Sequence, residues 1–190
     1  AMGHPIVIDP VGVSGSSYRR EKCLELMKII HPTCIRGNYS EIQALLHNCG
    51  TVTGVDAAED ALAEAEEPDL PELMKQHAKE NQMMLVASGE TDLITDGSCV
   101  YRCHNGSPMM ARITGSGCMS TVMLGAFLSA ENSVESAVAC CAFTGIAGEL
   151  AAKQTTAQKR GTMTFRNWFI DAVSLMTPEQ LEHGTNVDWF

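Results

Sequence analysis

The sequence lacks the long apolar run that a membrane-spanning helix requires. No 18 consecutive residues are free of polar side chains, and the first residues do not show the basic and then apolar layout of a signal peptide. Basic residues are also scarce, because 13 Lys and Arg stand against 23 Asp and Glu and leave a formal net charge of −10. This charge opposes binding to nucleic acid or to an anionic membrane. We expect a soluble, cytoplasmic protein whose partner is a small molecule.

Several familiar site motifs are missing as well. The eight cysteines include no C-x-x-C pair and no zinc-type histidine spacing, and they lie in apolar segments, which favours reduced thiols over disulfides or structural zinc. Neither the G-x-G-x-x-G dinucleotide motif nor the G-x-x-x-x-G-K-[ST] phosphate loop is present. A chain of 190 residues is long enough for one core, so we expect a single domain over residues 1–190 with a tail at residues 184–190.

The most informative stretch is residues 113–130, where a glycine-flanked turn runs into an apolar helix. Gly115 and Gly117 allow positive φ and a close approach of the backbone to a ligand. The N–H groups of Gly115, Ser116, Gly117 and Cys118 then predict an anion hole at the helix N-terminus, where a cysteine thiolate is also stabilised. The alternative is that the turn is an ordinary Gly-x-Gly before a helix and that Cys118 is a small apolar residue.

Apolar segments closed by turn residues predict a mostly parallel sheet covered by helices. The abrupt first strand also leads us to expect further strands and helices before it. Gly145 and Gly148 lie in a predicted helix and indicate a close approach to a second helix. The predicted strands are 5–8, 33–36 and 83–87, with a hairpin of 92–95 and 98–103 around Asp96-Gly97. The predicted helices are 16–30, 38–46, a proline-interrupted stretch over 56–80, 116–130, 133–153 and 162–176.

Charged and polar side chains follow these strands at the edge where open α/β sheets bind ligands. Asp9 follows the first strand, Ser88 follows the third, and Arg36 and Glu41 flank the turn after the second. Each has a local alternative, since Asp9 and Ser88 also suit turns and Glu41 stands three residues after Asn38, the spacing of a capping box. The gathering of charge at one edge favours a binding site over capping.

Four motifs in order give the chain a specific resemblance. IVIDPVG (6–12), IRGNYSEI (35–42), SGETDLITDG (88–97) and ITGSGC (113–118) resemble hydroxyethylthiazole kinase, the thiamine-salvage family of the ribokinase-like superfamily. The resemblance covers nearly all 190 residues, including AGELAA at 147–152. It implies an α/β fold, the ribokinase-like three-layer α/β/α sandwich with a mostly parallel sheet. The match corresponds to the C-terminal two-thirds of the family's chain, without its N-terminal strands and helices.

The resemblance also implies roles for the residues in these motifs. Cys118 matches the residue in the family's catalytic-base position, and Gly115 matches a substrate-contacting glycine. Arg36 and Ser88 match the ATP-contacting residues, with Ser88 in place of a threonine. Asp9 and Glu41 match the acidic residues associated with Mg²⁺ and phosphates. Mg²⁺, ATP as co-substrate and a homotrimer with sites between subunits are further implications of the resemblance.

The implied reaction is transfer of the γ-phosphoryl group of ATP to the primary alcohol of 5-(2-hydroxyethyl)-4-methylthiazole. Because the family's first strands contribute to the thiazole site, we expect reduced activity from a chain that lacks them. One alternative is a related kinase acting on another small alcohol, such as a sugar or a pyrimidine or pyridine methanol. Another is a catalytically incompetent fragment that binds nucleotide. A cysteine hydrolase is disfavoured because no histidine stands in a recognisable partner motif.

Overall fold

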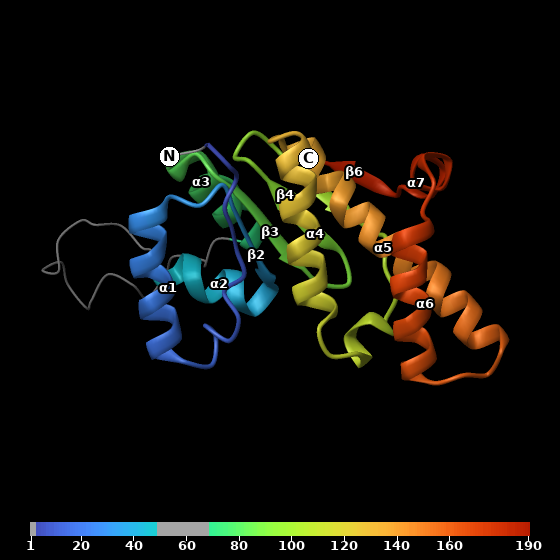
Figure 1. Ribbon diagram of the computed structural model, residues 1–190. Helices are drawn as coiled ribbons and strands as arrows, with labels where there is room; N and C mark the ends of the chain where they lie inside the picture. The colour runs from blue at the N-terminus through green and yellow to red at the C-terminus, as the bar shows by residue number, and fades with distance from the viewer. Residues whose placement is uncertain (1–2, 49–68) are drawn as a thin grey trace, which may run out of the picture.

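The computed structural model describes residues 3–48 and 69–190, which form three layers around a central sheet (Figure 1). The strands are β1 (Val7–Ile8), β2 (Cys34–Asn38), β3 (Met84–Ser88), β4 (Asp92–Thr95), β5 (Val100–Cys103) and β6 (Val187–Trp189). The helices are α1 (Ser17–Ile30), α2 (Tyr39–Asn48), α3 (Leu70–Asn81), the short 3-10 helix η1 (Met110–Arg112), α4 (Ser116–Ala130), α5 (Val134–Ala157), α6 (Thr162–Leu175) and α7 (Pro178–Gly184). The predicted α/β fold is confirmed.

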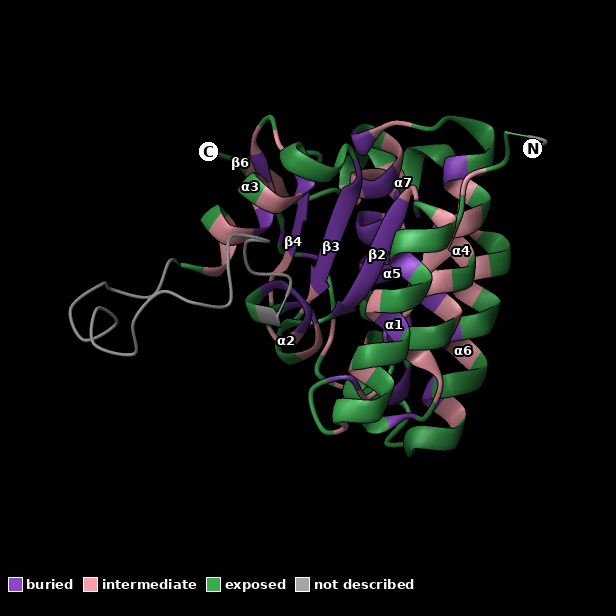
Figure 2. Ribbon diagram, turned by 90° about the vertical axis from the view of Figure 1, so that its left-hand side faces the viewer, coloured by how far each residue is buried: buried purple, intermediate pink, exposed green. Residues whose placement is uncertain are grey.

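The sheet is covered on both faces because its strands are apolar on both sides. Ile35 and Leu85 pack with α1, α2 and α3, whereas Cys34 and Val86 pack with α4 and α5 on the other face. Figure 2 shows the buried strands between the two helical layers, and α6 packs against α5 through Phe165. Strands buried on both faces read as continuous apolar runs, which is why the sequence revealed them.

The helix termini follow the local signals that the sequence carries. The Ser16 side chain accepts the Arg19 N–H at the start of α1, and Ser133 caps α5 in the same way. The left-handed conformation of His31 ends α1 directly before Pro32. These predictions are confirmed because caps are formed by residues adjacent in sequence.

The sheet is mixed, so the expectation of a mostly parallel sheet is wrong. The pairs β1–β2 and β2–β3 are parallel, but β3–β4, β4–β5 and β5–β6 are antiparallel. The predicted Asp96-Gly97 turn is present, and Gly97 has φ of +95° there. Because β4 turns back beside β3, every later strand in the order β1-β2-β3-β4-β5-β6 continues the antiparallel half.

The C-terminal residues form structure where we expected a tail. Residue 184 ends α7, and Val187–Trp189 form β6, which pairs with β5. The side chain of Asp188 forms ion pairs with Arg102 and His104. A strand of three residues is too short to show a period, and its partner lies more than 80 residues earlier in the chain, so the local pattern could not reveal it.

The two glycines of α5 face a loop and not a second helix. A Cβ at Gly145 would lie 2.5 Å from the Asn105 backbone, and one at Gly148 would overlap the Met110 side chain. The prediction of close approach is therefore confirmed, but the neighbour is the segment between β5 and α4. Helix α5 is also long and apolar enough to cross a membrane, yet 61% of its most apolar window is buried inside the protein, as in a core helix.

Two further expectations concern the central segment and the cysteines. The predicted helical stretch over 56–68 lies outside the described residues, and its continuation is seen as α3. No disulfide is present among the cysteines of residues 3–48 and 69–190.

Candidate functional site

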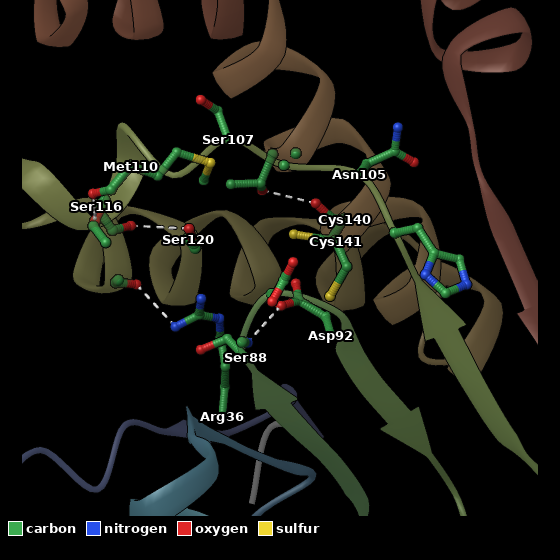
Figure 3. Close-up of a pocket in the computed structure, with 18 of the residues that line it drawn as sticks. Arg36, Ser88, Asp92, Asn105, Ser107, Met110, Ser116, Ser120, Cys140 and Cys141 are labelled. Atoms are coloured by element: carbon green, nitrogen blue, oxygen red, sulfur yellow. Dashed lines mark hydrogen bonds between the residues drawn. The ribbon is translucent and has the colours of Figure 1, made fainter. Parts of the chain in front are cut away.

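A cavity of about 740 Å³ lies at the carboxyl ends of β2 and β3, between the start of α4 and the middle of α5 (Figure 3). Four of the predicted site residues line it: Arg36, Ser88, Ser116 and Gly117. Asp9, Glu41, Gly115 and Cys118 are close in the fold or the chain but are not among its lining residues. The edge of the sheet at which the sequence predicted a binding site thus contains a cavity, and the cationic side chain of Arg36 lines it.

Arg36 links the sheet to helix α4. Its side chain comes from β2 and is 9% exposed, and its Nη1 donates to Gly117 O at 3.1 Å and to Thr121 Oγ1 at 3.3 Å. Thr121 in turn donates to Asp9 Oδ2 at 2.9 Å. A buried cation is costly unless its donors are occupied or a negative charge is near. The hydrogen bonds of Arg36 run through Nη1, so its other guanidinium donors can meet an anionic ligand at the cavity wall.

Asp92 is a carboxylate of the cavity that the sequence did not single out. Burial raises the pKa of Asp92, while the Gly89 N–H, which donates to Oδ1 at 3.0 Å, and the nearby Arg36 guanidinium lower it. Asp92 opens β4 in the quoted motif SGETDLITDG, where it reads only as the first residue of a hairpin strand. Its approach to Arg36 arises from strand pairing, which no local signal reports.

Ser88 stands at the end of β3, where the sequence placed it. Its hydroxyl donates to the Gly37 carbonyl at 3.2 Å, which fixes the hydroxyl oxygen at the cavity edge beside Arg36. That oxygen keeps lone pairs with which it can accept a further hydrogen bond. The turn role and the ligand role of Ser88 are therefore compatible.

The start of α4 presents unpaired backbone donors to the cavity. Gly115 has φ of +93° at the N-cap, and the first helical bond runs from the Met119 N–H to Gly115 O at 2.9 Å. The N–H groups of residues 116–118 therefore precede the hydrogen-bond ladder of the helix. No acidic side chain lies in this first turn. The geometry is that of an anion-binding helix terminus next to a buried arginine.

Cys118 lies on a different side of the same helix turn. The cavity-facing residues of α4 include Gly117, Ser120 and Leu124, which share one face, and Cys118 is turned about 100° beyond Gly117. Its thiol is exposed. A group that reacts with Cys118 would thus approach the helix terminus from solvent, beside the cavity lining and not from within it.

Glu41 performs the capping role that the sequence left open. Its Oε2 accepts the Asn38 N–H at 2.9 Å, and the Asn38 side chain accepts the Glu41 N–H at 2.9 Å. The other oxygen, Oε1, accepts the Gly12 N–H at 2.8 Å. Glu41 therefore ties the loop after β1 to the start of α2.

The residues at this edge do not form a ready-made metal cage. Among residues 3–48 and 69–190, no three His, Cys, Asp or Glu side chains gather as metal ligands. Mg²⁺ usually keeps several waters and takes only one or two carboxylates together with substrate phosphates. Asp9, with one oxygen bound to Thr121, fits such a partner better than Glu41, whose two oxygens both accept backbone N–H groups.

Part of the cavity lining is apolar, with contributions from Met110, Leu124 and the thiols of Cys140 and Cys141. Burial raises the pKa of Cys140 to about 11 and that of Cys141 well above its usual value, so both thiols are neutral at physiological pH. A ligand that carries both an anionic group and an apolar ring suits a cavity lined by Arg36 and by these side chains.

The chain matches one family over most of its length. Residues 1–179 match the sequence profile of the Hydroxyethylthiazole kinase family. The chain is 38% identical over 177 residues to Hydroxyethylthiazole kinase 1 of Methanosphaera stadtmanae. The aligned part covers 90% of this chain and 62% of that protein. It is also 38% identical over 189 residues to the hydroxyethylthiazole kinase of Cereibacter sphaeroides, and that aligned part covers 99% of this chain and 68% of the relative.

A solved structure has a similar fold. It is described as the hydroxyethylthiazole kinase protein from Pyrococcus horikoshii OT3, with a TM-score of 0.79 and 24% sequence identity over 98% of this chain and 65% of that chain. The present chain thus spans 62% to 68% of the length of these three relatives.

Proposed function

Because the chain belongs to the hydroxyethylthiazole kinase family, we propose that it acts in the transfer of the ATP γ-phosphoryl group to the primary alcohol of 5-(2-hydroxyethyl)-4-methylthiazole, a step of thiamine salvage. The observation that carries the proposal is Arg36, a buried cation at a cavity wall beside the unpaired N–H groups of α4. Phosphoryl transfer depends mainly on positioning and on stabilising negative charge, which these groups supply.

ATP would lie in the cavity with its phosphates toward Arg36. Ser88 and the N–H groups of Ser116 and Gly117 line the same end and suit phosphate oxygens. The adenine ring would lie against apolar side chains of the same lining, such as Met110 and Cys140.

The alcohol would approach from the side of Cys118. The oxygen of the alcohol forms the new bond to the γ-phosphorus while the bond between that phosphorus and the β,γ-bridging oxygen breaks, and ADP leaves. Cys118 would orient the alcohol and accept its proton, and the N–H groups of Gly115 to Cys118 would meet the developing charge. The position of Cys118 in the first turn of α4, directly after the cavity-lining residue Gly117, supports this assignment.

Mg²⁺ would accompany the nucleotide and neutralise charge on its phosphates. Asp9 and Glu41 are the carboxylates that we assign to it, with waters between, because Mg²⁺ retains its water readily. Both oxygens of Glu41 already accept backbone N–H groups, so Glu41 would reach the ion only through water, and Asp9 is the better-placed carboxylate.

We also propose that residues 1–190 fold as one cytoplasmic domain that assembles as a homotrimer. Val122 on α4 is 75% exposed one turn after Cys118, so an apolar surface adjoins the substrate side. A neighbouring copy would cover this surface and complete the alcohol site. A solution mass of one or two chains would contradict the trimer.

The direct test is an ATP-consumption assay with a panel of alcohols. Hydroxyethylthiazole should be phosphorylated with a higher kcat/KM than pyridine, pyrimidine or sugar alcohols. A preference for one of those alcohols would replace the substrate and keep the reaction. Binding of ATP without turnover of any alcohol would instead identify a nucleotide-binding protein.

A further inference from the structure

One wall of the cavity is the segment between β5 and η1. Residues 104–108 of this segment line the cavity, and we call them the wall loop. The wall loop lies against α5 so closely that the Asn105 backbone occupies the place of a Cβ at Gly145. Because the loop belongs to no helix or strand, its position depends on bonds to its surroundings.

The side chain of Asn105 makes those bonds. Asn105 is 8% exposed, and its Nδ2 donates to the Gly184 carbonyl at 2.8 Å and to Glu149 Oε1 at 3.1 Å. Its Oδ1 accepts the Asn186 N–H at 2.8 Å. Both amide hydrogens are used, and so is the amide oxygen. One buried side chain therefore joins the wall loop to α5 and to the C-terminal segment.

The C-terminal segment holds the wall loop at a second point. The His104 N–H donates to Asn186 O at 2.9 Å, and His104 Nε2 lies 2.8 Å from Asp188 Oδ2. We call residues 184–188 the C-terminal brace. Four bonds, one with Gly184, two with Asn186 and one with Asp188, thus reach the first two residues of the wall loop.

Helix α5 provides the third support through Glu149. Its Oε1 accepts the Gly106 N–H at 2.8 Å in addition to the Asn105 amide. Gly145 and Glu149 are one turn apart on the same face of α5. Gly145 leaves room for the backbone of the wall loop, and Glu149 accepts hydrogen bonds from it. The helix and the brace therefore both hold the wall loop.

We propose that Asn105 is a positioning residue for nucleotide binding, and that the C-terminal brace acts through it to fix the cavity wall. The inference rests on the proposed function, since it assigns this cavity to ATP. Loss of the brace would let the wall loop move and would weaken ATP binding. It would leave the rate of phosphoryl transfer from bound ATP nearly unchanged, because Arg36 and the start of α4 do not depend on these bonds.

The test combines Asn105→Ala with the pair Glu149→Ala and Glu149→Gln. Asn105→Ala should raise the Kd for ATP by about tenfold, the scale of one buried hydrogen bond lost at the 1.4 kcal/mol conversion. Glu149→Ala should raise it by several-fold, and Glu149→Gln should restore it because glutamine keeps the accepting oxygen. Glu182→Ala is the matched control, since it removes the same charge from the exposed side of α7.

Hydrogen exchange gives a readout that does not depend on nucleotide. The Gly106 N–H should exchange faster in Asn105→Ala and Glu149→Ala than in wild type, and at the wild-type rate in Glu149→Gln. Should Asn105→Ala fail to fold, the Glu149 pair decides alone. Unchanged exchange together with an unchanged Kd in Glu149→Ala would overturn the inference. Absence of ATP binding to the wild type would refute the proposed function instead, and exchange would still decide whether the brace holds the loop.

Discussion

At the scale of single residues, the site depends on three charged side chains, Arg36, Asp9 and Asp92. Arg36 has its donors directed at Gly117 and Thr121, Asp9 is reached through Thr121, and Asp92 lies on the cavity side. The sequence indicated Arg36 and Asp9 because they stand at, or directly after, the carboxyl ends of predicted strands. Thr121 stands one helical turn after Gly117 in an apolar helix, and nothing local separates it from a core residue.

The first prediction concerns Cys118. Cys118→Ala should lower kcat for hydroxyethylthiazole by roughly 10²-fold, the usual scale for loss of a general base, with little change in the KM of the alcohol. Cys118→Asp should retain activity, because a carboxylate also accepts a proton and is stabilised at a helix N-terminus. Steady-state kinetics of both variants from pH 6 to 9 make the comparison. A loss below about tenfold in Cys118→Ala would mean that charge stabilisation alone carries the reaction.

The second prediction concerns the pH dependence of stability. Burial raises the pKa of Asp92, so the folded protein holds this proton more tightly than the unfolded chain does. Wild-type stability therefore falls as the pH rises from the unfolded value of about 3.9 through the raised folded pKa. Asp92→Asn cannot ionise and escapes this loss. Its Tm should exceed that of wild type at pH 8, and the difference should shrink toward pH 4.

Thermal melts at several pH values test this prediction. Asp171→Asn makes the same chemical change at an exposed position on α6 and serves as the control. If Asp92→Asn is less stable than wild type at pH 8, the attraction between Asp92 and Arg36 outweighs the cost of burial, and the sign assigned here is wrong.

At the scale of elements, the wall loop packs so closely against α5 that it restricts the side chain at position 145. Gly145→Ala should lower the free energy of unfolding by about 1–3 kcal/mol, because its Cβ would lie 2.5 Å from the Asn105 backbone. Gly125→Ala on α4 is the matched control, since a Cβ there meets nothing within 4 Å. It should stabilise the protein by up to about 1 kcal/mol through helix propensity. Denaturant unfolding of both variants checks the opposite signs; a stabilised Gly145→Ala would show that the loop yields freely.

Local patterns in the sequence reveal where helices begin but not which distant residues they contact. The caps at Ser16 and Ser133 and the reciprocal bonds of Asn38 and Glu41 were predictable, because each joins residues three apart. The partner of Gly145 was not, because a glycine signals only that something is close. The β6 strand was missed for the same reason: its pairing with β5 is set by tertiary contact.

At the scale of the whole molecule, the parallel half of the sheet places the site. The register Asn38 to Ser88 brings the ends of β2 and β3 together, which is the rule that located the site from the sequence. The antiparallel half supplies the other wall through Asp92 and Asn105, and the C-terminal segment bonds to Asn105. Asp92 and Asn105 come from hairpin and loop positions that carry turn chemistry alone in the sequence, so the second half of the cavity was not predictable from it.

The most direct test of the account is the affinity for ATP of wild type and of Arg36→Ala, measured by titration calorimetry with Mg²⁺ present. Arg166→Ala removes the same charge from an exposed position on α6 and is the control. A charge-assisted contact to phosphate is worth roughly 1.5–3 kcal/mol, so Arg36→Ala should raise the Kd by about 10- to 150-fold while Arg166→Ala leaves it unchanged. Equal Kd values in wild type and Arg36→Ala, with both proteins folded, would contradict the assignment of this cavity to the phosphates of ATP.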